Sequence, residues 1–428
     1  MKKLFALALA LCMLLGAVTV AQAETTKLTM WTFIAQHQDF FEKAAERWNA
    51  ENPDRQIEIE VTTIGYDDMH NRYKIALQSD DGSAPDLCDV ELGQFPNVLA
   101  YSDKLVDLTE ALTPYMPDLV TSRLEIYAKD GKYYGAPLHV GGMVAYYDVA
   151  LLESAGVNYE DIKTWDDWYE AGLKLKEADP DAWMGTVETS TQWVSNLMLA
   201  QMGTDFQDDN LNATVNTPEL AKAIDIQKSW LEAGIADTCP GGQPDTEEGK
   251  AYIAQNKIAS VIMPFWYMSR FVDEIGEVCA DRYVVAPPPA FEGSQWASVG
   301  AGGTGTVVYA GTDHADLAAE FVVYAKITPE GEAQIWDVLG FDPVNTSIWD
   351  DEAIMKTDDN KFNQYFIGYP IDALLPIKTQ IGYNRSTSIS PIINNYVGTT
   401  LWNEVYVDGV DTAEALENAQ DAIESDLF

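Results

Sequence analysis

Residues 136–147 read APLHVGGMVAYY, and this stretch decides how the chain is divided. It carries no Asp, Glu, Lys or Arg, and Gly141 and Gly142 lie in its middle. An apolar run without polar alternation is typical of a central strand that is buried on both faces. Glycines also suit a strand that passes from one lobe to another, because they tolerate backbone conformations that other residues avoid. Both interpretations remain open at this point.

The residues before this stretch alternate between strand and helix patterns. Strands are predicted over 27–33, 57–61 and 87–92, and helices over 39–52 and 69–77. The helices show apolar residues at helical spacing, whereas the strand at 57–61 alternates apolar and acidic residues. This rhythm predicts a parallel sheet with helices packed on it.

The residues after the stretch repeat the α/β pattern. Helices are predicted over 165–176, 219–232 and 315–325, a strand over 258–263, and a final helix that a capping residue, Asp411, begins. Between them, three consecutive prolines at 287–289 exclude regular helix and central sheet, and a glycine cluster follows at 300–305. We interpret the region near 288–298 as a second passage between lobes.

The N-terminus has the order of a secretory signal peptide. Lys2 and Lys3 precede an apolar run over 4–20, and small residues at 21 and 23 follow it. The run is too short for a membrane span, and we predict cleavage after Ala23. Cys12 is not predicted to carry a lipid, because Leu11 stands where lipid processing requires a small residue.

Composition narrows the partners. The chain has 68 acidic and 26 basic residues, which gives a formal net charge of −42. This charge disfavours binding to nucleic acid and to anionic lipid. The four histidines are scattered without metal-ligand spacing, so no metal site is predicted, and no cofactor is implied. Cys88, Cys239 and Cys279 remain after the signal peptide; pairing of Cys239 with Cys279 and two free thiols are both open.

Several strings of residues resemble those of one protein family. They are MWTF at 30–33, APD at 84–86, GKYYGAP at 131–137, YYD at 146–148, LLESAGV at 151–157 and TWDDW at 164–168. On these strings the chain resembles the extracellular solute-binding proteins of the maltose-binding type, which serve ATP-driven sugar importers. Further strings resemble the arabinose, arabino-oligosaccharide and lactose binders of that family: MHN at 69–71, IALQS at 75–79, MPFWYM at 263–268, GGTGT at 302–306 and LGFDP at 339–343.

The resemblance implies a two-lobe α/β fold, the type II periplasmic-binding-protein fold, in which each lobe is a mainly parallel sheet flanked by helices and a hinge joins them. It implies a non-catalytic, monomeric protein in the periplasm or on the outer face of the membrane, which hands a sugar or oligosaccharide to the permease of an importer. Closure then occurs about three crossings, the third near 349–351. The implied lobes are 24–138 plus 298–349, and 139–297 plus 350–428.

Ligands of open α/β sheets bind outside the carboxyl ends of the parallel strands. By this rule His37 and Gln38, in the loop after the first strand, are expected to face the cleft between the lobes. Glu91 and Gln94, at the end of the third strand, are expected to join them.

Three glycines and a histidine on the crossings are further candidates. Gly141 lets a ligand approach the backbone, and Gly302 and Gly303 are expected to offer backbone amides, although a turn explains these two equally well. His139 is compatible with a hydroxyl contact and, equally, with a buried structural histidine.

The second lobe is expected to contribute aromatic and polar groups, because sugars present apolar faces edged with hydroxyls. Gln192 and Trp193 lie in a polar loop after a strand at 184–187. Trp266 directly follows another strand, and the resemblance places it at a sugar-stacking tryptophan; the alternative is a core residue. Arg270 is expected either to donate to hydroxyls or to pair with a carboxylate. The far wall is assigned to Tyr383, Asn384 and Arg385.

A secreted glycoside hydrolase is the alternative function. It needs two carboxylates about 5–10 Å apart across the sugar bond, and a chain with 68 acidic residues always offers a pair. The eightfold strand–helix alternation of a barrel is absent from the pattern, and so are the repeats of a structural surface protein. Both points favour a binding protein.

Overall fold

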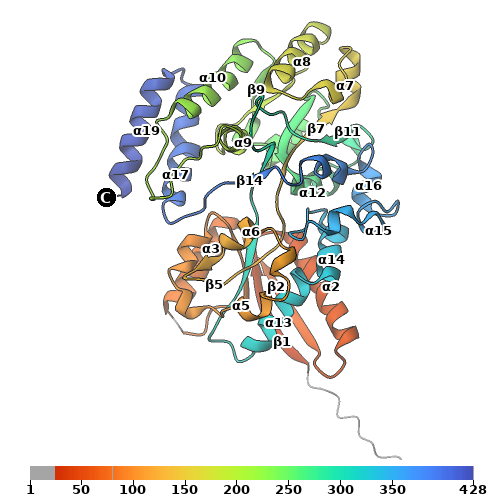
Figure 1. Cartoon of the computed structure of the whole chain (residues 1–428), viewed down its shortest axis with the longest axis vertical. Coiled ribbons are helices and arrows are strands. Elements are labelled where there is room, and N and C mark those ends of the chain that lie inside the picture. Colours follow the sequence, from red (N-terminus) through yellow and green to blue (C-terminus); the bar gives the residue numbers. More distant parts are fainter. Residues whose placement is uncertain (1–24, 80, 428) are drawn as a thin grey trace, which may run out of the picture.

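The computed structural model describes residues 25–79 and 81–427, which form two α/β lobes joined by several passages of the chain (Figure 1). The lobe drawn below holds the first strands, and the lobe drawn above holds the C-terminal helix. Among the described residues, no helix combines the length and apolar character needed to cross a membrane.

The sheet of the first lobe has the strand order β2-β1-β3-β13-β6. Strands β1 (Thr26–Thr32), β2 (Ile57–Thr63) and β3 (Leu87–Glu91) run parallel to one another. Strand β13 (Thr304–Val308) joins them antiparallel and also pairs antiparallel with β6 (Ala136–Pro137). The sheet therefore combines strands that precede the second lobe in the sequence with β13, which follows the strands of that lobe at 143–286.

Helices cover this sheet as their apolar spacing predicts. Helix α2 (Ala35–Glu51) buries Phe40, Phe41, Ala44 and Trp48. It begins one turn earlier than predicted, at Ala35, and His37 in its first turn contacts Asp89 of β3. The other helices and short strands of this lobe are α3 (Tyr66–Ser79), α4 (Phe95–Leu99), α5 (Thr109–Leu112), α6 (Thr121–Glu125), β4 (Ala128–Lys129), β5 (Lys132–Tyr133), α13 (Ala315–Lys326) and α14 (Pro329–Leu339).

The second lobe repeats this plan. Strand β7 (Met143–Asp148) pairs antiparallel with β10 (Ser260–Pro264) and with β11 (Tyr283–Ala286). Strands β8 (Gly185–Val187) and β9 (Ala236–Thr238) pair in parallel. A parallel bridge just before β8 and β10, between Trp183 and Ile258, connects the two sets.

The five-stranded sheet is thus mixed and both pairs of the β10-β7-β11 sheet are antiparallel, whereas a mainly parallel sheet was expected in each lobe. The strands that run antiparallel to their neighbours are β13 and β7. The chain enters β13 directly after crossing from the second lobe, and it enters β7 directly after crossing from the first lobe. The parallel strands end where the lobes meet, so a strand that enters from there must run in the opposite direction. This correction follows from the exchange of strands between lobes and leaves the two-lobe α/β class unchanged.

The helices of the second lobe have clear start signals. Thr164 forms a capping box with Asp167 at the start of α8 (Trp165–Ala178), and Asp411 accepts bonds from the first amides of α19 (Thr412–Leu427). The other helices are α7 (Val149–Ser154), α9 (Trp193–Gln201), α10 (Pro218–Glu232), α11 (Glu247–Ile253), α12 (Met268–Arg270), α15 (Glu352–Met355), α16 (Lys361–Tyr365), α17 (Ser390–Tyr396) and α18 (Trp402–Tyr406).

The chain passes between the lobes at defined segments. The first crossing, residues 138–142, joins β6 to β7, so the stretch quoted at the outset passes between the lobes and then becomes a buried central strand of the second lobe, and both interpretations hold. The second lies at 300–303, after β12 (Ser298–Gly300) has paired with β14 (Ile381–Tyr383), and not near 288–298 as expected. The reason is that Val299 still packs in the core of the second lobe. A third passage lies between α14 and α16.

The three cysteines of the described residues, Cys88, Cys239 and Cys279, are free and buried. Residues 25–79 and 81–427 contain no group of three His, Cys, Asp or Glu side chains arranged to hold a metal ion.

Candidate ligand-binding site

The carboxyl ends of the first sheet face the second lobe, and two hydrogen bonds join the lobes there. Ser386 Oγ donates to the carbonyl oxygen of Leu92, just after β3, at 2.6 Å. On the other side, Gln36 Nε2 on α2 donates to Glu274 Oε1 at 3.5 Å.

Trp266 lies directly after β10 and reaches toward the second crossing. Its Nε1 donates to the carbonyl oxygen of Ala301 at 3.0 Å, and the side chain of Trp193 meets it edge-on, with ring centroids 5.8 Å apart. The Arg270 guanidinium lies 5.3 Å from the indole centroid, and a Cβ on Gly302 would be 3.0 Å from Nε1. The residue is therefore only 8% exposed and has both core and interlobe contacts.

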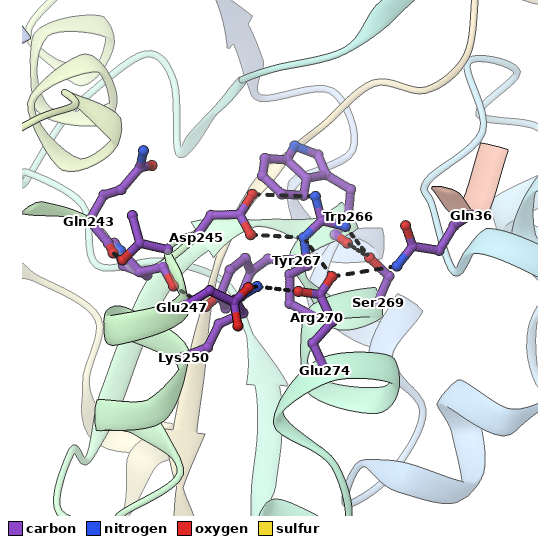
Figure 2. A network of polar contacts seen from close by, with 12 residues as sticks. Gln36, Gln243, Asp245, Glu247, Lys250, Trp266, Tyr267, Ser269, Arg270 and Glu274 are labelled. Atoms are coloured by element: carbon purple, nitrogen blue, oxygen red, sulfur yellow. Dashed lines mark hydrogen bonds and ion pairs between the residues drawn. The ribbon is translucent and has the colours of Figure 1, made fainter. Parts of the chain in front are cut away.

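Arg270 pairs with carboxylates, one of the two predicted alternatives. Its Nε donates to Asp245 Oδ1 at 2.8 Å, and its Nη2 donates to Asp245 Oδ2 at 3.3 Å (Figure 2). Glu274 lies 3.5 Å away and also binds Lys250, which pairs with Glu247 as well. Three carboxylates therefore hold two cations, and Arg270 supports the indole from a fixed position.

The remaining residues predicted for the second lobe lie in two places. Gln192 caps α9 and donates from Nε2 to Asn394 Oδ1 at 2.7 Å, while Trp193 Nε1 donates to Gln243 Oε1 at 3.2 Å. A Cβ on Gly93 of the first lobe would be 3.9 Å from Asn394 Nδ2. Gln192 and Trp193 therefore lie at the surface that meets the first lobe.

The side chains of residues 383–385 differ in exposure and in their contacts. Tyr383, the last residue of β14, is 51% exposed. Arg385 is held by Asp205 and Asp209, with its Nε 2.8 Å from Asp209 Oδ1. Asn384 Oδ1 is buried and has no hydrogen-bond partner among the described residues.

Glu91 and Gln94 lie where the strand-end rule places them. Glu91 Oε2 accepts from Gly93 N at 2.7 Å and from the Tyr66 hydroxyl at 3.0 Å, and burial raises the pKa of Glu91. Tyr66 is 38% exposed and meets Phe33 edge-on at 5.2 Å. Gln94 is the half-buried residue at the start of α4. This corner offers aromatic rings beside a carboxyl group.

His37 serves the interior of the first lobe. Its Nδ1 lies 2.9 Å from Asp89 Oδ2, and the ring is 1% exposed. Asp89 also accepts from Thr306, whose hydroxyl accepts from the buried Lys326 at 2.7 Å. Burial lowers the pKa of Lys326 to about 8. Gln38, by contrast, is half-buried and bonds to a glutamate one turn along α2.

His139 is 4% exposed, and neither ring nitrogen has a hydrogen-bond partner among the described residues. Its ring meets Phe341 edge-on at 4.7 Å, and burial lowers its pKa well below the usual value. The glycines bring the crossings together: a Cβ on Gly141 would be 2.4 Å from the carbonyl oxygen of Ala301. Gly302 and Gly303 both have positive φ, +68° and +129°.

Sequence reasoning missed several residues at this surface. Tyr66 follows β2 and was accessible to the same strand-end rule that found Glu91. Asp245 and Asn394 lie in helical or irregular segments far along the chain and have no local pattern that marks them. Only the folded chain brings these two beside Arg270 and Gln192.

Comparisons with known proteins agree with this architecture. A family model described as bacterial extracellular solute-binding protein matches residues 34–328. An arabinooligosaccharide-binding protein of Halalkalibacterium halodurans is 39% identical over 404 residues, 94% of this chain and 90% of the relative. An arabinooligosaccharide-binding protein of Bacillus subtilis is 36% identical over 392 residues, 89% of each chain.

Solved structures share the fold at low identity. The GacH receptor of Streptomyces glaucescens superposes with a TM-score of 0.74 at 19% identity, covering 94% of this chain and 98% of that one. A transporter-associated binding protein of B. animalis subsp. lactis, solved with beta-1,6-galactobiose, has a TM-score of 0.75 at 18% identity, covering 94% and 97%. From the family match and the relatives above, the chain belongs to the bacterial extracellular solute-binding proteins.

Proposed function

We propose that this protein is the exported substrate-binding subunit of an ATP-driven sugar importer and that it binds arabino-oligosaccharides between its lobes. The observation that carries the proposal is the identity to two arabinooligosaccharide-binding proteins along about nine tenths of the chain. The strings around Trp266 and the glycines at 302–303 that prompted the sugar assignment lie inside the matched region. The membrane permease of the importer is the proposed partner, and the protein is proposed to act as a monomer.

The proposed site has the chemistry that a neutral saccharide requires. Trp193 and Trp266 from the second lobe and Tyr66 from the first provide flat apolar surfaces. Glu91 Oε2 already accepts two bonds, and the second oxygen of this carboxyl is proposed to accept from a hydroxyl. The proposed ligand-binding set is Gln38, Glu91, Gln94, His139, Gly141, Gln192, Trp193, Trp266, Gly302, Gly303, Tyr383 and Arg385. The other two predicted residues, His37 and Arg270, bond to Asp89 and Asp245 and are proposed to support the site without contacting the ligand.

Capture is proposed to occur by closure of the lobe that contains β1, β3 and β13 against the lobe that contains β7, β10 and β11, about the crossings at 138–142 and 300–303. A ligand shifts the equilibrium toward closure only by the contacts that it makes to both lobes at once. The bond from Ser386 to Leu92 and the bond from Gln36 to Glu274 also span the lobes. These bonds are proposed to form on closure.

The proposal predicts a ligand preference that calorimetry measures directly. Titrations with arabinose, arabinobiose, arabinotriose, lactose and maltotriose are expected to give the tightest binding for an arabino-oligosaccharide, by about tenfold or more over maltotriose. A preference for maltotriose or lactose would redirect the assignment within the family. Chromatography of the same mixtures after long incubation is expected to show unchanged saccharide, and steady release of products would favour the hydrolase alternative.

Export is proposed to remove residues 1–23, which lie outside the described residues. The expected N-terminus of the protein from its native host is Glu24, because small residues occupy positions 21 and 23. Mass spectrometry of the intact secreted protein checks this. A lipid-modified cysteine at position 12 as the first residue would contradict it.

A further inference from the structure

Two buried ionisable side chains lie on opposite sides of the first crossing. Arg123 comes from α6 of the first lobe and is 2% exposed. Asp342 follows α14 on the third passage and is 0% exposed. Burying a charge is costly unless hydrogen bonds satisfy it, so the contacts of these two residues indicate what they do.

Arg123 binds the carbonyl oxygens of two crossings. Its Nε donates to His139 of the first crossing at 3.3 Å, and its Nη2 donates to Gly302 of the second. A Cβ on Gly303 would lie 2.5 Å from Nη2, and one on Gly300 would lie 3.2 Å from Nη1. The guanidinium therefore occupies the space that side chains would take at both glycines.

Asp342 binds the amides of the first crossing from the other side. Oδ1 accepts from Gly141 N at 3.1 Å, and Oδ2 accepts from Gly142 N at 2.8 Å. The main-chain oxygen of Asp342 accepts from Val140 N at 2.9 Å. Three consecutive amides of the crossing are thus bonded to one residue.

The arrangement follows the geometry of the peptide bond. A trans peptide points its C=O and N–H in opposite directions, so the unit between His139 and Val140 faces Arg123 with its oxygen and Asp342 with its amide. Hydrogen bonds to charged groups are stronger than those between neutral groups. Bending at 139–142 would break these bonds between groups that are buried, which is costly.

We propose that Arg123 and Asp342 are positioning residues that hold the first two crossings in register and so define the axis about which the lobes close. The expected effect of these two residues on ligand affinity rests on the proposed saccharide-binding function. With both residues present, the ligand-free protein samples a narrow range of lobe separations. Without one of them, the crossing exchanges bonds with other partners, and fewer molecules are competent to bind.

The test compares Asp342→Asn with a matched control. An asparagine keeps one acceptor but turns an NH₂ group toward a glycine amide that also donates. The control is Asp148→Asn, at the far end of β7, where a carboxylate of equal burial accepts from Leu151 N and pairs with Arg282. Both changes replace a buried aspartate that accepts from backbone N–H groups, two for Asp342 and one for Asp148, but only Asp342 lies at a crossing.

Lobe separation is measured between spin labels on Glu46→Cys of α2 and Lys174→Cys of α8, both exposed. Asp342→Asn is expected to broaden the ligand-free distance distribution and to weaken saccharide binding about tenfold. Asp148→Asn is expected to lower stability and leave both quantities unchanged. Arg123→Lys, which retains the charge but not the two-carbonyl geometry, is expected to broaden the distribution to an intermediate degree and serves if Asp342→Asn does not fold.

A folded Asp342→Asn variant, or Arg123→Lys in its place, with wild-type distance distribution and affinity would overturn the proposal. Equal broadening in Asp148→Asn would overturn it too, because general loosening would then explain the effect. If the wild-type protein binds none of the saccharides, the ligand-free distances still decide the hinge question. Failure of the proposed function is therefore distinguishable from failure of this inference.

Discussion

Replacing Trp266 by alanine is expected to weaken saccharide binding by about ten- to a hundredfold and to lower the free energy of unfolding by about 3–5 kcal/mol. The affinity loss follows from the proposed stacking of the indole on a sugar face. The stability loss follows from the burial of the ring, which is 8% exposed and packs against Trp193. The hydrogen bond from Nε1 to Ala301 is lost as well.

Calorimetry with the best saccharide and denaturant unfolding of the ligand-free protein separate the two effects. Trp266→Phe is the matched control, since it keeps an aromatic face but loses the bond to Ala301. It is expected to retain most of the affinity if stacking dominates. Unchanged affinity in Trp266→Ala, together with a large stability loss, would move this residue from the site to the core.

The free energy of unfolding is expected to fall as the pH rises from about 5 to about 8. Burial raises the pKa of Asp205 to about 6, of Asp342 to about 7 and of Glu188 to about 8. In the unfolded chain these carboxyl groups lose their protons near pH 4. The folded protein therefore binds more protons across this window, so its stability declines with rising pH, by about 1.4 kcal/mol for each unit by which a pKa is raised.

His70 acts in the opposite direction over part of the window. Burial lowers its pKa to about 4, so its contribution to stability increases with pH until the unfolded side chain is neutral, near pH 6.5. Three carboxyl groups with raised pKa values outweigh the lowered pKa of His70, so the decline is expected across the whole window and becomes shallower toward pH 8, as Asp205 and then Asp342 lose their protons. Burial lowers the pKa of Lys326 to about 8, so its contribution to the free energy of unfolding increases with pH above that range.

Urea unfolding at a series of pH values measures this dependence. Glu188→Gln replaces one raised carboxyl by a neutral side chain of the same shape and is expected to flatten the slope between pH 6.5 and 8. Glu188 accepts from Val194 N on α9, whereas the amides of the first crossing bond to Asp342. A wild-type stability that stays level or rises over this range would contradict the prediction.

The sequence by itself determined the elements and their alternation. Most predicted helices and strands, such as α10 (Pro218–Glu232) and β2 (Ile57–Thr63), appear within a few residues of their predicted ends. Apolar periodicity and capping residues act over one or two turns, and such signals are readable without the rest of the chain. The strand predicted over 87–92 also matches β3, which ends at Glu91.

Only the tertiary structure decided how these elements are used. The partners of Arg270, the antiparallel direction of β7 and β13, and the clamp of Asp342 on Gly141 all depend on residues distant in sequence. Residues 141 and 342 lie about 200 positions apart, and neither carries a local pattern that names the other. Local signals specify the conformation of each segment. The hydrogen-bond partners of the buried polar groups are decided only when the chain has crossed between the lobes and those groups must be satisfied away from water.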